Sequence, residues 1–506
     1  MKKHRLLIVY LAVYVLVNLL FLARFPVVHS DETWLSGLSR NMLQQGSLAV
    51  TEPFFDLKPR FPHAIKSVFH LLQMPFLQVF GYNAFAFRLL SLLGGAAALW
   101  VFYFVVLRAS GQKPLAFAAC VLLSLDVQFI QAAHFARAEI LVLLGMLLCV
   151  YLLLGTGRFA HLWAGVVTGV CIGLHPNSFL VAGLCGGLLV AACIRDKRFH
   201  WRRILGYVGV VAAFAAFFVA LSFWFDPQFP AHYLAYGDEF AVSSGLLAKL
   251  GEVIPYLQRL FFRVTGTYNL PDIRFQLVLF GVVLAAAVAL QRWVPQLSAL
   301  LWGLLGMAAA MTLVGRFSQP YVIFYFPLCY LMLALLLGYS WPRRAAVAVG
   351  GLAVAVGLMA AVQIVPVATQ PAQYDRYIEE IATVVPQDAK TIGNLNAGYH
   401  FTNGALLDVR NLSYLRQSGL SLAQYVETRG VEYLIISDEL YALYEKRPYW
   451  NGVYGNIHYL QQLDELLENH CTLVHSFVDN QYGVRVAEWQ NTARDFTVRI
   501  YHYDGG

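Results

Sequence analysis

The sequence has little charge, and its cysteines form no pattern that would constrain a fold. Only 13% of the 506 residues are charged, whereas soluble domains carry about 25%, which excludes an ordinary soluble protein. Six of the seven cysteines lie within apolar runs and Cys471 stands alone, so we expect no disulfide framework and no cysteine metal site. The polar part after Pro366 contains no glycine-rich phosphate loop and no nucleophile elbow, and the chain contains no internal repeat or low-complexity segment. The apolar runs are therefore the main source of information.

Hydrophobic residues make up 59% of the chain and are gathered in long runs. A run of about 20 residues crosses a hydrocarbon core of about 30 Å. The first run, 6–22, is longer than the core of a signal peptide, which has about 7–15 residues, and no cleavage site follows it. We therefore expect a polytopic α-helical membrane protein whose first span is retained. Its eleven predicted spans are 5–23, 84–107, 114–131, 139–155, 161–176, 177–194, 204–224, 275–291, 297–315, 321–341 and 345–366.

Basic residues occur in short clusters between alternate runs. With the N-terminus in the cytoplasm, the cytoplasmic connections hold Arg108/Lys113, Arg158, Arg195 to Arg203, Arg292 and Arg343/Arg344. This agrees with the positive-inside rule, and it explains the net charge of +7 without nucleic acid as a partner. Eleven spans place the C-terminus outside the cytoplasm. We expect the protein to lie in the inner (cytoplasmic) membrane. The count is open by two, because it depends on a tight hairpin at 174–177.

Two long outer segments and a polar C-terminal part remain. The segment 24–83 contains an amphipathic helix that we expect to lie at the membrane interface, with its apolar side formed by Trp34, Leu35, Leu38, Met42 and Leu43. The second segment, 225–274, is mixed in character. Charges become frequent after Pro366, so we divide the chain into a membrane domain, 1–366, and an outer soluble α/β domain, 367–506. In that domain 391–393 and 432–436 are predicted strands, and 421–429 and 459–468 are predicted helices.

Two acidic motifs stand near the outer membrane surface. Ser30 followed by Asp31 and Glu32 is typical of a helix cap, because acids suit the first turn of a helix. The same pair is also a candidate catalytic pair. Arg137 and Glu139 lie in a short outer turn, where they serve either as headgroup-level anchors or as functional groups.

Further polar residues are predicted on the same outer face. Lys58 and Arg60 lie in a proline-rich loop together with Asp56 and His63. Three more candidates come from later outer turns: His175, Arg316 and Tyr321. Each could be an ordinary interface residue. Their convergence on one surface, with a carboxylate pair facing several cations, suits transfer from a phosphate-activated donor: a base takes the acceptor proton while cations stabilise the departing phosphate.

Four stretches together resemble the C-type (GT-C) superfamily of membrane glycosyltransferases, in the branch of protein O-mannosyltransferases and lipid A aminoarabinose transferases. Residues 31–43 resemble the Asp-Glu motif and its following outer helix. Residues 58–91 are similar to the Lys-Pro-Pro helix and the Arg-Leu-x-Ser start of the second span. Residues 135–139, Phe-Ala-Arg-Ala-Glu, resemble the Arg-Pro-Asp turn, and 320–327 resemble a late Tyr…Pro span.

The resemblance implies a GT-C fold and an inverting transfer of a sugar from a polyprenyl phosphate to an extracytoplasmic hydroxyl of a protein, lipid or glycan. By motif, Asp31 is the base and Glu32 neighbours the acceptor or a metal. Lys58, Arg60 and Arg137 are implied to hold the donor phosphate. A divalent metal stays open, with Glu32, Asp56 and His63 as candidate ligands.

The sequence departs from the family pattern in places. Leu-His-Pro-Asn at 174–177 replaces a Lys-Gly-Pro hairpin, and Trp34 stands where aminoarabinose transferases have an arginine. These departures leave the reaction type in place and the sugar open. Two other functions also stay open: a transporter or flippase of a lipid-linked or anionic substrate, and a membrane-anchored binding protein that acts through its last 140 residues.

Overall fold

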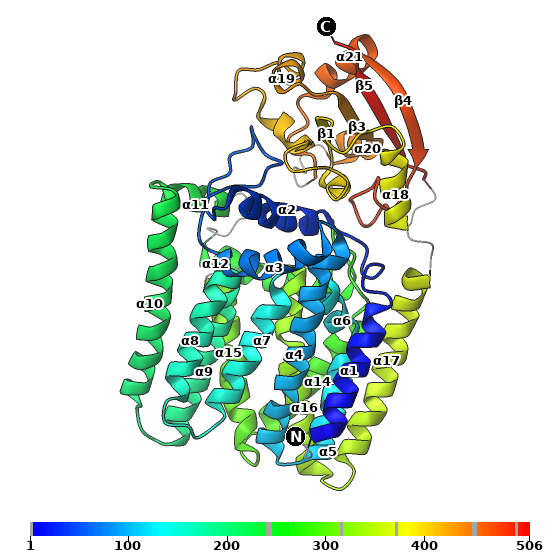
Figure 1. The fold of residues 1–506 in the computed structure, drawn as a ribbon. Helices are drawn as coiled ribbons and strands as arrows, with labels where there is room; N and C mark the ends of the chain where they lie inside the picture. Colours follow the sequence, from blue (N-terminus) through cyan, green and yellow to red (C-terminus); the bar gives the residue numbers. More distant parts are fainter. Residues whose placement is uncertain are drawn as a thin grey trace.

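The computed structural model describes residues 4–238, 245–264, 266–313, 317–369, 373–447, 453–490 and 494–505. Figure 1 shows a bundle of roughly parallel helices with a smaller part containing a β-sheet at one end. The two chain termini lie at opposite ends of the molecule. The bundle helices are α1 (Arg5–Leu19), α4 (Ala84–Ser110), α5 (Lys113–Ser124), α6 (Val127–His134), α7 (Glu139–Leu153), α8 (Ala160–Leu174), α9 (Ser178–Arg195), α10 (Trp201–Phe225), α14 (Arg274–Leu290), α15 (Pro295–Leu313), α16 (Phe326–Ser340) and α17 (Ala345–Thr369).

Each predicted span overlaps a helix or a pair of helices of this bundle. Within the described ranges, six helices are long and apolar enough to cross a membrane, and α5 with α6, bent by 66°, makes a seventh if the pair is one span. The other predicted spans correspond to the shorter apolar helices α1, α7, α8 and α14. The multi-pass helical fold is thus confirmed, while the count of eleven stays a prediction.

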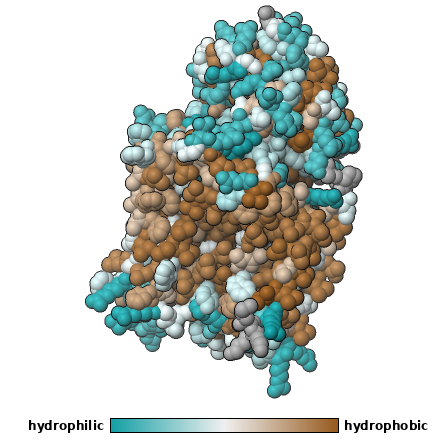
Figure 2. Space-filling model, in the orientation of Figure 1, coloured by the Kyte–Doolittle hydropathy of each residue, from teal (hydrophilic) through white to brown (hydrophobic). Residues whose placement is uncertain are grey.

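On the face shown in Figure 2, a broad hydrophobic band covers the bundle and is bordered by hydrophilic residues at both ends. Helices suit this environment because they satisfy their backbone hydrogen bonds internally. The outer helix α10 illustrates this environment. Only 11% of its most apolar 18-residue stretch is buried inside the structure, compared with 78% for the corresponding stretch that includes α16. The exposed apolar side chains of α10 therefore face the lipid.

Helices α2 (Ser30–Gln45) and α3 (Ser67–Phe80) lie across the end of the bundle, below the sheet-containing part (Figure 1). The helix predicted in the first outer segment is therefore present, but its environment differs from the prediction. Its buried side chains include Thr33 and Ser36, whereas Trp34 and Leu35 are only half-buried. The reason is that α2 is covered on its outer side, where the Thr33 hydroxyl donates to the Leu395 carbonyl (2.7 Å). It is an internal layer rather than an interface helix.

Residues 373–505 contain a five-stranded sheet with the order β2-β1-β3-β5-β4. The strands are β1 (Thr391–Gly393), β2 (Leu406–Asp408), β3 (Tyr433–Ser437), β4 (Cys471–Val478) and β5 (Thr497–Tyr503), and the helices are α18 (Gln373–Ala382), α19 (Leu422–Arg429), α20 (Glu439–Lys446) and α21 (Leu460–His470). Strand β1 is parallel to β2 and β3, whereas β5 is antiparallel to β3 and β4. Both predicted strands and both predicted helices are present. Helix α17 continues past Pro366 and ends at Thr369, just beyond the predicted boundary between the two domains.

The second outer segment forms three short helices, α11 (Phe229–Asp238), α12 (Leu246–Gly251) and α13 (Val253–Phe261). The loop before α3 joins the two parts of the molecule. The Asn411 side-chain oxygen accepts from the backbone N–H groups of Asp56, Leu57 and Lys58 at 3.1 to 3.3 Å. Its amide nitrogen donates to the Phe54 carbonyl (2.9 Å). One asparagine therefore fixes the conformation of the loop that carries Lys58 and Arg60.

Candidate active site

Asp31 lies in the first turn of α2. The residue that caps this helix is His29, not Ser30 as the sequence predicts: the His29 ring accepts from the Asp31 N–H (3.0 Å). The Glu32 carboxylate in turn accepts from the His29 N–H (3.0 Å), which completes a capping box. Ser30 is instead buried and its hydroxyl accepts from Arg485 (2.7 Å). The cap leaves the Asp31 side chain free for other contacts.

Asp31, Arg137 and Glu139 come together as the outer-face prediction requires. Arg137 Nη1 donates to Asp31 Oδ2 (2.8 Å), and its Nη2 and Nε donate to the two oxygens of Glu139 (2.6 and 3.2 Å). The hydroxyl of Tyr268, from the second outer segment, also donates to Asp31 Oδ2. The Asp31 side chain is 26% exposed, so it remains accessible from outside. One guanidinium thus lies between two carboxylates, one of which meets solvent.

Electrostatics keep Asp31 ionised and His29 neutral. Burial alone would raise the pKa of Asp31, but His29, the Arg137 cation and the Tyr268 hydrogen bond lower it below its ordinary value. Burial lowers the pKa of His29 to about 4, and the Arg485 and Arg137 cations act in the same direction. At neutral pH the site therefore holds an aspartate ion beside an uncharged imidazole.

Glu32 is bound by the protein itself. Its side chain and that of Arg88, on α4, are both fully buried, and Arg88 Nε and Nη2 donate to its two oxygens (2.8 and 2.7 Å). The Ala136 N–H donates to Glu32 Oε2 (3.1 Å). Ser91, also on α4, donates to the Phe135 carbonyl (2.7 Å). Glu32 and α4 therefore fix the turn that presents Arg137 to Asp31.

Arg60 and Lys58 lie on a separate loop. Arg60 Nε and Nη2 donate to the two oxygens of Glu52 (3.0 and 2.7 Å), and Glu52 also accepts from the Trp34 indole (2.7 Å). Burial lowers the pKa of Arg60, but Glu52 outweighs it and raises this pKa above its ordinary value. The Lys58 side chain is half-buried. The Arg60 cation is thus neutralised within its own loop.

The remaining candidates lie in other turns. The His175 ring accepts from the Asn177 N–H (3.1 Å) and so shapes the predicted hairpin between α8 and α9. Tyr321 is buried in the short 3-10 helix η2 (Gln319–Phe324). Arg316 lies outside the described residues. Neither His175 nor Tyr321 lines the pocket that contains His29 and Tyr268.

The three candidate metal ligands are engaged separately. Glu32 binds Arg88, Asp56 accepts from Tyr425 (2.7 Å) and pairs with Arg429 (2.6 Å), and His63 packs edge-on against Tyr233. No group of three His, Cys, Asp or Glu side chains suited to a metal occurs within the described parts of the chain. These residues do not fit one shared ion.

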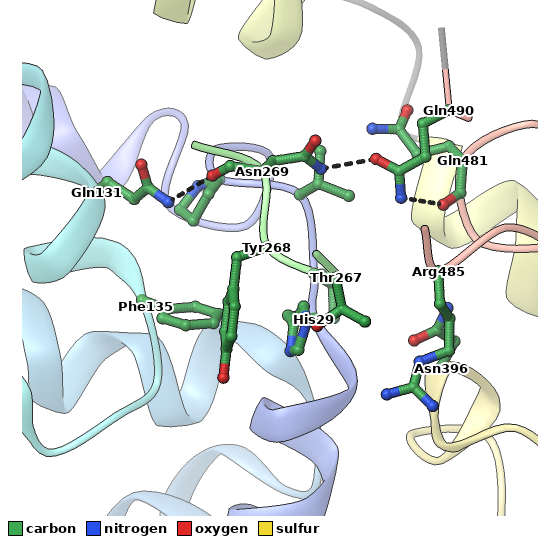
Figure 3. Close-up of a pocket in the computed structure, with 13 residues that line it drawn as sticks. His29, Gln131, Phe135, Thr267, Tyr268, Asn269, Asn396, Gln481, Arg485 and Gln490 are labelled. Carbon is green, nitrogen blue, oxygen red and sulfur yellow. Dashed lines mark hydrogen bonds between the residues drawn. The ribbon is translucent and has the colours of Figure 1, made fainter. Parts of the chain in front are cut away.

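A pocket lined by His29 and Tyr268, which both contact Asp31, lies where both outer segments meet the sheet-containing part (Figure 3). The His29 and Tyr268 rings are stacked there, with centroids 4.4 Å apart. Figure 3 shows these rings between Phe135 on one side and Arg485 on the other. Polar amides complete the wall: Gln131, Asn269, Asn396, Gln481 and Gln490. The pocket therefore provides many hydrogen-bonding groups and one cation next to the ionised aspartate.

Sequence reasoning missed four members of this site. His29 lies two residues before Asp31, just outside the motif noted there, whereas Arg88 belongs to the Arg-Leu-x-Ser stretch already noted. Tyr268 and Arg485 have no local signal, because they lie 237 and 455 residues away from the residues they contact.

Comparison with known proteins gives structural matches only. No protein-family model matches the chain, and no curated protein matches it. Among solved structures, ArnT from Cupriavidus metallidurans in the apo state matches with a TM-score of 0.58 and 13% identity, covering 99% of this chain and 98% of ArnT. ArnT bound to undecaprenyl phosphate matches with a TM-score of 0.54 and 15% identity over 98% and 97% of the two chains. An Archaeoglobus fulgidus oligosaccharyltransferase, in complex with Zn and sulfate, matches with a TM-score of 0.50 and 14% identity over 88% and 70%.

The expected GT-C fold is thus confirmed across nearly the whole chain. The chain has the fold of the GT-C membrane glycosyltransferases, and the matches to ArnT cover at least 97% of both chains. At these identities the likeness defines the fold, and the chemistry must be argued from the site.

Proposed function

We propose that this protein is a membrane glycosyltransferase that moves a sugar from a polyprenyl phosphate to a hydroxyl group outside the cytoplasm. The observation that carries the proposal is the ionised, partly exposed Asp31, which lies between Arg137 and Tyr268 beside an open polar pocket. The ArnT structure with undecaprenyl phosphate supports a polyprenyl phosphate as the donor carrier.

In the proposed reaction, the acceptor oxygen forms a bond to the anomeric carbon while the bond from that carbon to the phosphate oxygen breaks. The electron pair stays on the phosphate, and the hydroxyl proton passes to Asp31. Attack from the face opposite the phosphate inverts the anomeric centre. Arg137 and Tyr268 both donate to Asp31 Oδ2, whereas Oδ1 lies 3.6 Å from Nδ1 of the neutral His29 ring, so Oδ1 is the oxygen placed to receive the proton.

The low pKa of Asp31 calls for a change when the donor arrives, because a strongly stabilised carboxylate is a weak base. Arg137 offers the means, since it is shared by Asp31 and Glu139. A donor phosphate that attracts Arg137 would weaken its contact with Asp31 and raise the pKa of the aspartate. The same cation would stabilise the phosphate that leaves. Glu32 then has a positioning role through the Ala136 N–H.

The proposal is tested with Asp31→Asn, which keeps the shape of the side chain and removes the base. We expect transfer to fall by a factor of about 10²–10⁴. Cells lacking the protein are complemented with wild type or variant, and their envelope glycans are compared by mass spectrometry. Asp388→Asn is the matched control, because Asp388 is exposed in the C-terminal part. Normal glycans with Asp31→Asn would show that Asp31 is not the base.

A further inference from the structure

Four arginines are buried in the described parts of the chain, and two of them are paired with a carboxylate, Arg88 with Glu32 and Arg410 with Asp408. Two others, Arg40 and Arg485, are each only 6% exposed and have no ion pair with a described carboxylate. A buried cation without a counter-charge is costly, so each of these two arginines needs an explanation.

Arg40 has an aromatic partner within the protein, while its buried Nε and Nη2 have no hydrogen-bond partner in the described structure. Its guanidinium lies over the Tyr82 ring, 3.7 Å from the ring centroid, and its Nη1 donates to the Phe401 carbonyl (2.7 Å). The aromatic face provides the negative potential that a carboxylate would otherwise supply.

Arg485 has no such partner. Its Nη1 and Nη2 donate to neutral oxygens, the Val453 carbonyl (3.1 Å) and the Ser30 hydroxyl (2.7 Å). Its buried Nε has no hydrogen-bond partner in the described structure. The charge of the guanidinium is therefore only partly compensated, because Asp408 and Glu439 act on it through space and its buried Nε stays without a hydrogen bond.

The position of Arg485 is fixed by its backbone. The N–H groups of Arg485 and Val486 both donate to Glu439 Oε1 (2.7 and 2.6 Å), which anchors the loop between β4 and β5 to α20. The side chain then reaches from the C-terminal part towards His29 and lines the pocket next to Asp31 (Figure 3). A preorganised cation of this kind binds an anion without further ordering.

We propose that Arg485 binds a phosphate-type oxyanion in this pocket, so that the C-terminal part of the chain contributes directly to substrate binding. Arg60 is paired with Glu52, and Arg137 is shared by two carboxylates, so Arg485 is an additional cation at this face rather than a replacement for Arg137. Only the choice of undecaprenyl phosphate as a probe rests on the proposed function. A phosphate from a water-soluble ligand has the same chemistry, and the experiment separates these two sources.

Binding is measured with the full-length protein in detergent, without turnover, by adding undecaprenyl phosphate in one arm and inorganic phosphate in the other. In at least one arm, Arg485→Gln is expected to weaken binding by about 10- to 100-fold, the range for a lost hydrogen bond to a charged group. Arg40→Gln is the matched control, because Arg40 is also a buried arginine without a carboxylate partner but does not line the pocket. A loss with the lipid identifies a lipid phosphate as the ligand, and a loss with inorganic phosphate alone identifies a water-soluble one. Unchanged binding in both arms overturns the proposal.

A second pair of variants covers the case in which Arg485→Gln fails to fold. Thr267 lines the same pocket, and the described structure gives its side chain no hydrogen bond. Thr267→Asp would introduce a carboxylate that competes for Arg485, so it should weaken phosphate binding, whereas Thr267→Asn should not. Equal binding by both variants would contradict the proposal. The binding test does not require catalysis. The result of the Asp31→Asn transfer experiment, which tests the proposed function, therefore does not change its outcome.

Discussion

The pair of Arg88 and Glu32 gives the sharpest stability prediction. Both side chains are fully buried, and Arg88 supplies two of the four hydrogen bonds that Glu32 accepts, the others coming from the His29 and Ala136 N–H groups. Arg88→Met removes both charge-assisted bonds and leaves the carboxylate buried with two backbone donors. Breaking a buried ion pair in this way costs about 3–5 kcal/mol.

Glu32→Gln tests the pair from the other side, because it leaves the Arg88 cation buried with only the Leu22 carbonyl (2.9 Å) and a neutral amide as acceptors. The double variant Arg88→Met/Glu32→Gln contains neither charge. We therefore expect its loss of stability to be smaller than the sum of the two single losses by about 2 kcal/mol.

The free energy of unfolding is measured for the four proteins in detergent by denaturant titration. The comparison of the four free energies requires that the unfolding transition of each protein is cooperative and reversible. A loss below about 1 kcal/mol for Arg88→Met, or single losses that simply add, would refute the reasoning that the buried charge dominates the cost.

Three further predictions concern the outer face. Asn411→Leu should reduce transfer and increase proteolysis near Lys58, because it removes the acceptor of three backbone N–H groups; equal proteolysis in wild type and variant would contradict this. Burial lowers the pKa of His63 to about 4, below its value of about 6.5 in the unfolded chain. As the pH drops between these two values, the unfolded state binds a proton that the folded state does not bind, so the free energy of unfolding falls. The loss from pH 7 to pH 5 should be about 2 kcal/mol smaller in His63→Gln than in wild type, measured by unfolding at both pH values, and equal losses would exclude His63 as a source. A reporter active only outside the cytoplasm, fused after Gly506, should be active; an inactive fusion would reverse the proposed orientation.

Part of the site could be predicted because its signals are local. The acidic pair at Asp31 and the Arg-Ala-Glu turn at Arg137 each stand next to an apolar run, and a topology based on basic connections brought them to one face. What could not be predicted is which cation meets which carboxylate. Arg60 was expected at the donor phosphate, yet it binds Glu52, a residue with no distinguishing pattern around it.

The sequence by itself determined that this protein is a multi-pass helical membrane protein with polar groups gathered at one end, because run length and charge position depend only on near neighbours in the chain. The tertiary structure alone decided that Glu32 is buried against Arg88, that Tyr268 holds Asp31, and that Arg485 reaches the pocket from the C-terminal part. These contacts join residues 56, 237 and 455 positions apart. Such pairings are set by how the helices, the outer loops and the sheet pack together, and no local periodicity encodes them.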